Sequence, residues 1–144
     1  MLSVTNYSPE HIAAGRARVA AQIAAYRHVL ATARDQAGDE EAVDAAFTSF
    51  EPVFFNNMVL TLDSYFTHRA RALEGKDGNP LNEVRVLCNS LVQNDGLLAL
   101  DKTIRLKPAT SVLGYDAGDE IALTEADFVR LSDAFFAEIE SKYV

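Results

Sequence analysis

Residues 67–85 read THRARALEGKDGNPLNEVR, and this segment joins two stretches with helical periodicity. Three cationic side chains precede Gly75, which is a typical residue just beyond a helix C-terminus, where cations complement the helix dipole. The letters KDGN that follow are typical of a turn. Asn79 and Pro80 then suit the N-cap and the first position of a new helix. The segment therefore predicts that one helix ends and the next begins here.

Helical patterns continue on both sides of this connection. Between Pro52 and His68 the only charged residue is Asp63, so we expect the helix over about 53–74 to be central and contacted on most sides. Four helices are predicted up to residue 94. The first runs from Ser8 to near Gly38, and a short acidic helix follows from Asp39 to Pro52. The other two cover about 53–74 and about 80–94.

The pattern changes after residue 100. KTIRL and DEIAL alternate polar and apolar residues, TSVLGY is rich in β-forming residues, and YDAGDE is typical of a hairpin turn. Residues 102–123 are therefore predicted to form a small antiparallel β-hairpin. Thr124, with Asp127 three residues later, predicts the start of a C-terminal helix over 124–142.

These elements predict a mainly α fold in a single domain of residues 1–144. We expect an antiparallel helical bundle of three long helices and a short acidic one, with a helical part over about 8–94. The β-hairpin is expected as an insertion before the C-terminal helix. The length of 144 residues suits one domain with a sizeable core.

The chain is acidic, with a net charge of −8. An acidic chain repels phosphate backbones, so we expect no nucleic-acid partner. We also expect no membrane partner, because the longest apolar run is too short and too polar to span a bilayer. The first residues lack the features of a secretory signal, and a cytoplasmic location follows as the expectation. Cys88, the only cysteine, is expected to be a small core residue.

Motifs of catalysis are missing from the sequence. There is no Gly-x-Ser-x-Gly elbow and no phosphate-binding glycine loop. None of the three histidines has the spacing of a paired zinc site, and no Glu-x-x-His motif of di-iron bundles occurs. We therefore expect no metal and no cofactor, and we do not expect the protein to be an enzyme.

Two interpretations of the cationic side chains near residue 68 stay open. Tyr65 lies one helical turn before His68 and Arg69, and Arg71 follows at i+3 from His68. These four side chains could line a pocket for a small anion such as a carboxylate or a phosphate. The simpler interpretation, which we favour, is a group of cations that complement the dipole at a helix end.

Asp63 also has two interpretations. A carboxylate among uncharged neighbours must be paired or protonated when it is buried, so Asp63 could be a catalytic base with a raised pKa. We favour a structural ion pair, with Arg16 as the expected partner.

Two functions follow from these patterns. The leading one is a small non-enzymatic interaction or accessory protein that forms a homodimer. It is motivated by the positive first helix, the acidic last helix and a stripe of alanines in the first helix, which indicates either helix propensity or a second packing face. The alternative is a protein or enzyme that binds a small anionic ligand in a pocket lined by Asp63, Tyr65, His68 and Arg69. The alanines of the stripe are Ala13, Ala17, Ala20, Ala24 and Ala31.

Overall fold

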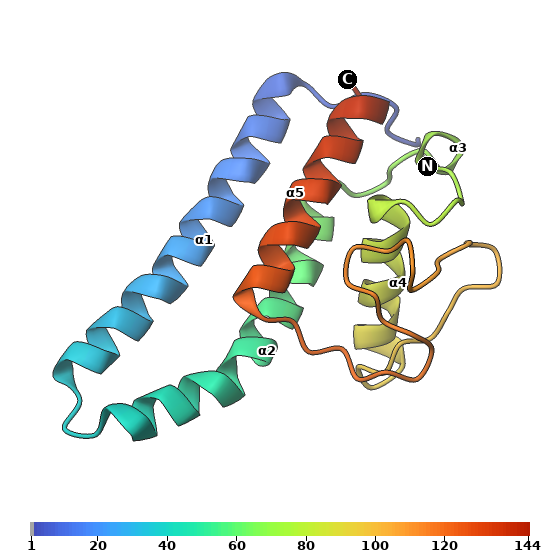
Figure 1. Ribbon diagram of the computed structural model, residues 1–144. Coiled ribbons are helices and arrows are strands. Elements are labelled where there is room, and N and C mark those ends of the chain that lie inside the picture. The colour runs from blue at the N-terminus through green and yellow to red at the C-terminus, as the bar shows by residue number, and fades with distance from the viewer. Residues whose placement is uncertain (1) are drawn as a thin grey trace.

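Four long helices form a bundle, and the prediction of a helical bundle is confirmed. The computed structural model describes residues 2–144. In Figure 1, α1 and α4 lie on either side of α5, α2 runs behind α5, and successive long helices alternate in direction. Both α1 and α4 contact α2 and α5. The helices are α1 (Pro9–Gln36), α2 (Glu40–Ser64), α3 (Arg71–Glu74), α4 (Pro80–Gln93) and α5 (Glu125–Lys142).

The helix starts follow from local capping chemistry. The side chains of Ser8 and Asp39 each accept a hydrogen bond from a backbone N–H in the first turn of their helix, both at 3.1 Å. Asn79 does the same for α4 at 2.9 Å. Thr124 and Asp127 form a reciprocal capping box at the start of α5. Each of these side chains satisfies an N–H that the helix itself cannot pair.

The prediction of separate helices before and after Pro52 is wrong, because α2 runs through Pro52 to Ser64. Proline removes one backbone hydrogen bond and bends a helix without necessarily ending it, and α2 changes direction midway along its length (Figure 1). The predicted continuous helix over about 53–74 is also wrong, because α2 ends at Ser64 and only the four-residue α3 ends at Glu74, with Gly75 as its C-cap. His68 has a positive φ of 60°, which is incompatible with a continuing α-helix.

The N-terminal segment replaces the helical hydrogen bonds that are lost after Ser64. The Val4 N–H donates to the carbonyl of His68 at 2.7 Å, and the Ala70 N–H donates to the carbonyl of Val4 at 2.8 Å. Val4 and Arg69 thereby form an isolated parallel bridge. In Figure 1 the blue N-terminal segment runs back to the region of α3.

α2 contacts α1, α4 and α5, as expected of a central helix, but its polar stripe is not covered by a neighbouring helix. The side chain of Asn57 on α2 is exposed, and it donates to the Val53 carbonyl of its own helix at 2.7 Å. Thr61 and Ser64 bond to carbonyls of the same helix in the same way. The uncharged stripe of α2 is therefore satisfied without a neighbouring helix. The buried residues of α4 are Leu81, Asn82, Glu83, Val84, Val86, Leu87 and Ser90.

The predicted β-hairpin over residues 102–123 is absent. Between α4 and α5 the structure contains no strand, and the single backbone bridge there pairs Leu97 with Glu120. The apolar side chains of the alternating segments turn into the bundle core instead of lining one face of a sheet. They include Ile104, Leu106, Ile121 and Leu123.

Side chains of the helices take the place of a partner strand. The buried carboxylate of Glu83 on α4 accepts hydrogen bonds from the N–H groups of Val112 at 2.7 Å and Leu113 at 2.9 Å. Asn56 on α2 donates to the Ile121 carbonyl at 2.9 Å and accepts from the Leu123 N–H at 3.0 Å. The connection between α4 and α5 is thus pinned to the helices at these polar contacts.

We expect Glu83→Ala to loosen this connection. The N–H groups of Val112 and Leu113 lose their acceptor, so their protection against hydrogen exchange should fall by about 1–3 kcal/mol. Glu120→Ala is the control, because it removes an exposed acid from the same connection. Equal protection of both amides in the two variants would contradict the role of Glu83.

Candidate functional site

The carboxylate of Glu74 is fully buried and lies between two arginines. Its Oε1 accepts from Arg69 Nε at 3.0 Å and from Arg85 Nη2 at 2.7 Å. Its Oε2 accepts from Arg85 Nε at 2.9 Å and from Asn82 Nδ2 at 3.0 Å. Both oxygens are therefore occupied, and the pair with Arg85 is bidentate.

Burial by itself would raise the pKa of Glu74. The hydrogen bond from Arg85, together with the positive charges of Arg69 and Arg85, outweighs burial and lowers this pKa from 4.5 to about 2. Glu74 is consequently ionised at neutral pH and acts as the fixed anion of the site.

Arg69 is held on several sides at once. Its Nη1 donates to Asp63 Oδ1 at 2.8 Å and to the Phe66 carbonyl at 3.0 Å. The guanidinium also lies 5.5 Å from the ring centroid of Phe135. Its Nη2 is buried and has no hydrogen-bond acceptor within residues 2–144. Arg69 therefore lies at the base of the site, fixed by two carboxylates.

Asp63 is an ion-pair partner of Arg69, with its own side chain 32% exposed. The expected partner Arg16 instead pairs with Glu140 on α5. Asp63 thus neutralises a buried guanidinium at the end of α2. This arrangement matches a structural ion pair, although the predicted partner was wrong.

His68, Arg69 and Arg71, three of the five predicted site residues, are brought together at one surface hollow of about 370 Å³. His68 and Arg71 are exposed, and Arg71 forms no ion pair within the described part of the chain. No acidic side chain lines the hollow. We call it the basic hollow; it is lined by Leu2, Ser3, His68, Arg69, Arg71 and Arg85.

Tyr65 does not line the basic hollow. Its hydroxyl accepts a hydrogen bond from Gln22 on α1 at 3.3 Å, and the guanidinium of Arg18 lies 5.6 Å from its ring centroid. The one-turn spacing from Tyr65 to His68 assumed a continuous helix, and α2 ends at Ser64.

Sequence reasoning missed Glu74 and Arg85, together with Leu2 and Ser3. One local signal was available for Glu74. An acid immediately before a helix-ending glycine opposes the helix dipole, so its presence there indicates a specific cationic partner. No comparable signal marks Ser3, because long-range contacts such as the pairing of Val4 with Arg69 bring the N-terminal segment to this place.

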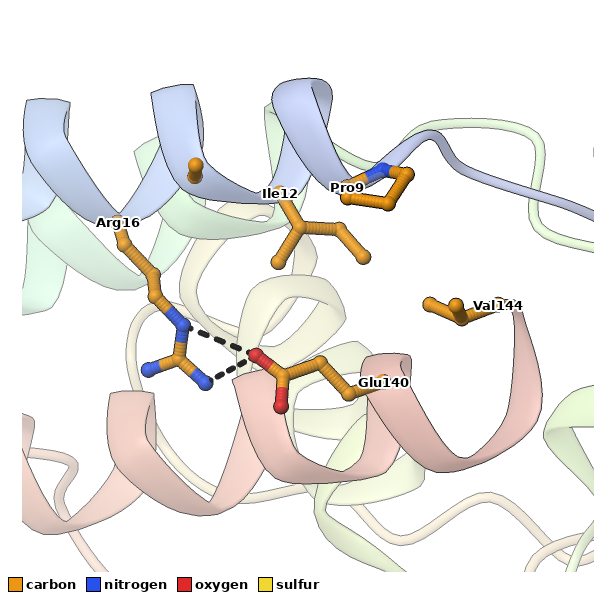
Figure 2. A pocket seen from close by; sticks show the side chains of 6 residues that line it. Pro9, Ile12, Arg16, Glu140 and Val144 are labelled. Atoms are coloured by element: carbon orange, nitrogen blue, oxygen red, sulfur yellow. Dashed lines mark hydrogen bonds and ion pairs between the residues drawn. The ribbon is translucent and has the colours of Figure 1, made fainter.

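A second hollow, of about 350 Å³, lies between the start of α1 and the end of α5. Figure 2 shows Arg16 reaching from α1 to Glu140 on α5, with Ile12 and Val144 alongside. Arg16 Nε donates to Glu140 Oε1 at 3.1 Å. The two charges of this hollow neutralise each other, so it lacks the excess positive charge of the basic hollow.

The far half of the α1–α2 hairpin has a different character. No residue from 27 to 54 is buried. Phe50 is 45% exposed and stacks on Tyr26, with ring centroids 6.3 Å apart, while Val29 and Val53 are 56% and 55% exposed. Val29 and Val53 each lie one helical turn beyond one of these two rings. We call this surface the outer face; it comprises Val29, Phe50, Val53, Asn57, Thr61 and Ser64.

We expect Glu74→Gln to lower the free energy of unfolding at pH 7 by about 3–5 kcal/mol, because two guanidinium groups lose their shared anion. The folded pKa of Glu74 lies below its ordinary value of 4.5. The difference in the free energy of unfolding between wild type and Glu74→Gln should therefore be largest above pH 4.5 and shrink as the pH falls toward 2. Urea unfolding at several pH values measures both effects.

Glu140→Gln is the matched control for a surface ion pair. Its carboxylate is 49% exposed, so its loss should cost less than about 1 kcal/mol. A difference between wild type and Glu74→Gln that does not change with pH would contradict the ionised state of Glu74.

Within residues 2–144, no three His, Cys, Asp or Glu side chains are grouped so that they could hold a metal ion. None of the helices there is long and apolar enough to cross a membrane. The groups that line the basic hollow include guanidinium, imidazole and hydroxyl groups. Comparison with protein-family models, curated proteins and solved structures gave no match to this chain.

Proposed function

We propose that this protein is a non-enzymatic interaction module that associates with a second copy of itself through the outer face. The single observation behind the proposal is that the outer face is exposed, partly apolar and free of charge. Large exposed apolar surfaces on a folded protein typically mark sites of association. A cytoplasmic location is part of the same proposal, and a lone cysteine without a disulfide partner agrees with it.

The projecting end of the hairpin supports this proposal. Residues 27–54 contain no buried residue, so few tertiary contacts hold this end of the hairpin against the bundle. Its exposed apolar side chains, among them Val29 and Val53, are only partly shielded from water by the bundle. Burial against another molecule would remove that apolar area from water, which is favourable in proportion to the area.

The polar residues of the outer face also suit burial. Asn57, Thr61 and Ser64 each donate a hydrogen bond to a carbonyl of α2 itself, at distances of 2.6–3.2 Å. Burying a donor that is already satisfied avoids the penalty of an unpaired polar group. The hydroxyl donors of Thr61 and Ser64 can therefore enter an interface without a new acceptor, whereas the amide oxygen of Asn57 needs a donor there.

Electrostatics favours a second copy at this face over other parts of the surface. Two copies that each carry a net charge of −8 repel each other at most approaches. On α2 no charged residue lies between Pro52 and Asp63, so two copies that meet there bring no like charges of this helix together. The alanine stripe of α1 is exposed as well and leaves room for close approach.

A non-enzymatic role is supported by the state of the strongest potential nucleophile. Burial raises the pKa of the Cys88 thiol to about 12. The thiol therefore stays protonated at neutral pH, and a protonated thiol is a poor nucleophile.

We expect wild type to be a dimer at high micromolar concentration and Val53→Glu to be a monomer, because the substitution brings one carboxylate per copy into an apolar contact. Light scattering coupled to size exclusion measures the mass directly. Val92→Glu is the matched control, since Val92 is 66% exposed at the end of α4 and lies outside the outer face.

The control should remain a dimer. A monomeric wild type would contradict self-association, and a dimer that survives Val53→Glu but dissociates in Val92→Glu would place the interface on α4 instead.

A further inference from the structure

We propose that the basic hollow binds a small molecule through a phosphate group. This inference is independent of self-association, because the basic hollow and the outer face have no residue in common. It is drawn from the charge balance of the hollow, the fixed geometry of its arginines, the backbone conformation of His68 and the size of the space.

The charge balance around the hollow is positive. Arg69 and Arg85 are balanced by two carboxylates, Asp63 and Glu74, whereas Arg71 has no ion pair in residues 2–144. The carboxylate of Asp101 lies close enough for the charge of Arg71 to act on it, but the two groups form no ion pair, and Asp101 Oδ1 accepts instead from the hydroxyl and the N–H of Thr103 at 2.6 and 2.8 Å. Within residues 2–144, Arg71 is therefore the arginine of the hollow that has no carboxylate in direct contact.

The geometry of Arg85 is fixed before any ligand arrives. Glu74 holds its Nε and Nη2 in a bidentate pair, and the side chain keeps 26% of its surface exposed at the hollow. Its Nη1 makes no hydrogen bond within the described residues, so this nitrogen stays available to an acceptor. A donor that is already positioned saves the entropy that a free arginine loses on binding.

His68 is held in a conformation that non-glycine residues seldom adopt. Its φ is 60°, and the Val4 N–H fixes its carbonyl at 2.7 Å. Backbone strain of this kind tends to occur at ligand-binding positions. The same pairing places Ser3 and His68 at one hollow, so that a hydroxyl and an imidazole lie beside the arginines.

A phosphate monoester fits this set of groups better than a carboxylate. It carries close to two negative charges at neutral pH and three acceptor oxygens, which match two guanidinium groups, an imidazole and a hydroxyl. The volume of about 370 Å³ lies in the range of small-molecule pockets, so it exceeds what a bare ion needs. Leu2, whose side chain is 92% exposed, is the apolar residue at the rim of the hollow.

The test uses inorganic phosphate as the probe, titrated at constant ionic strength and followed by NMR of the arginine Nε–Hε groups. Wild type should show saturable shifts at Arg85 with a Kd of roughly 1 mM or below. Arg71→Gln removes this cation from an exposed position and should weaken binding about tenfold or more. Arg18→Gln removes an exposed arginine on α1 and should leave the Kd unchanged.

His68→Asn is a second variant that keeps the backbone, because asparagine tolerates positive φ. It should weaken phosphate binding while the thermal midpoint stays close to that of wild type. Sodium acetate serves as the carboxylate probe and should shift the arginine resonances only weakly. Absence of saturation by phosphate in wild type, equal losses in Arg71→Gln and Arg18→Gln, or acetate binding as strong as phosphate binding would each overturn the proposal.

Discussion

The buried carboxylate of Glu74 is the constraint on which one end of the bundle depends. It joins Arg69, which follows α2, to Arg85 on α4, and so ties the two helices together across the connection between them. Removing a carboxylate and two guanidinium groups from water costs several kcal/mol for each ion. That cost is offset only when every oxygen and most donors find partners, as they do here. The connection therefore has one well-defined conformation.

The backbone around Glu74 is fixed by the ends of the chain. The carbonyl of Glu74 accepts from Asn79 Nδ2 at 2.6 Å and from Lys142 Nζ at 3.0 Å. The hydroxyl of Tyr143 donates to the Ala70 carbonyl at 2.9 Å. The C-terminus of α5 and the N-terminal segment thus close over the same short stretch. The basic hollow is the part of this assembly that stays open to solvent.

The helix starts were predictable because they depend on local capping chemistry. The end of α2 and the missing hairpin were not predictable because they depend on long-range contacts. Asn79 and Thr124 cap their helices through bonds that span only a few residues, so the sequence contains all the information needed. The end of α2 depends on Val4, which lies more than sixty residues away. The apparent strands fail for a similar reason. An alternation of polar and apolar residues indicates only that one side of the segment is buried. The acceptors that take the place of a partner strand come from Asn56 and Glu83 on distant helices.

The site was predictable to the extent that its residues are neighbours in sequence. His68, Arg69 and Arg71 were found because three cations stand together, but their separate roles depend on burial. Arg69 is fixed by two carboxylates, whereas Arg71 forms no ion pair within residues 2–144. A cluster of like charges in a sequence therefore does not show which of its members is available to a ligand.

α2 contributes to both surfaces. Phe50 and Val53, on either side of Pro52, are apolar residues of the outer face, while Asp63 near the end of α2 neutralises Arg69 beneath the basic hollow. Neither surface presents a free acidic side chain: the outer face has no charged residue, and the acids beneath the basic hollow are engaged by arginines. Repulsion of an approaching anion is therefore reduced at both places. The two proposals therefore share one electrostatic argument: a second copy is expected where α2 carries no charge, and an anion is expected where the nearby acids are already paired with arginines.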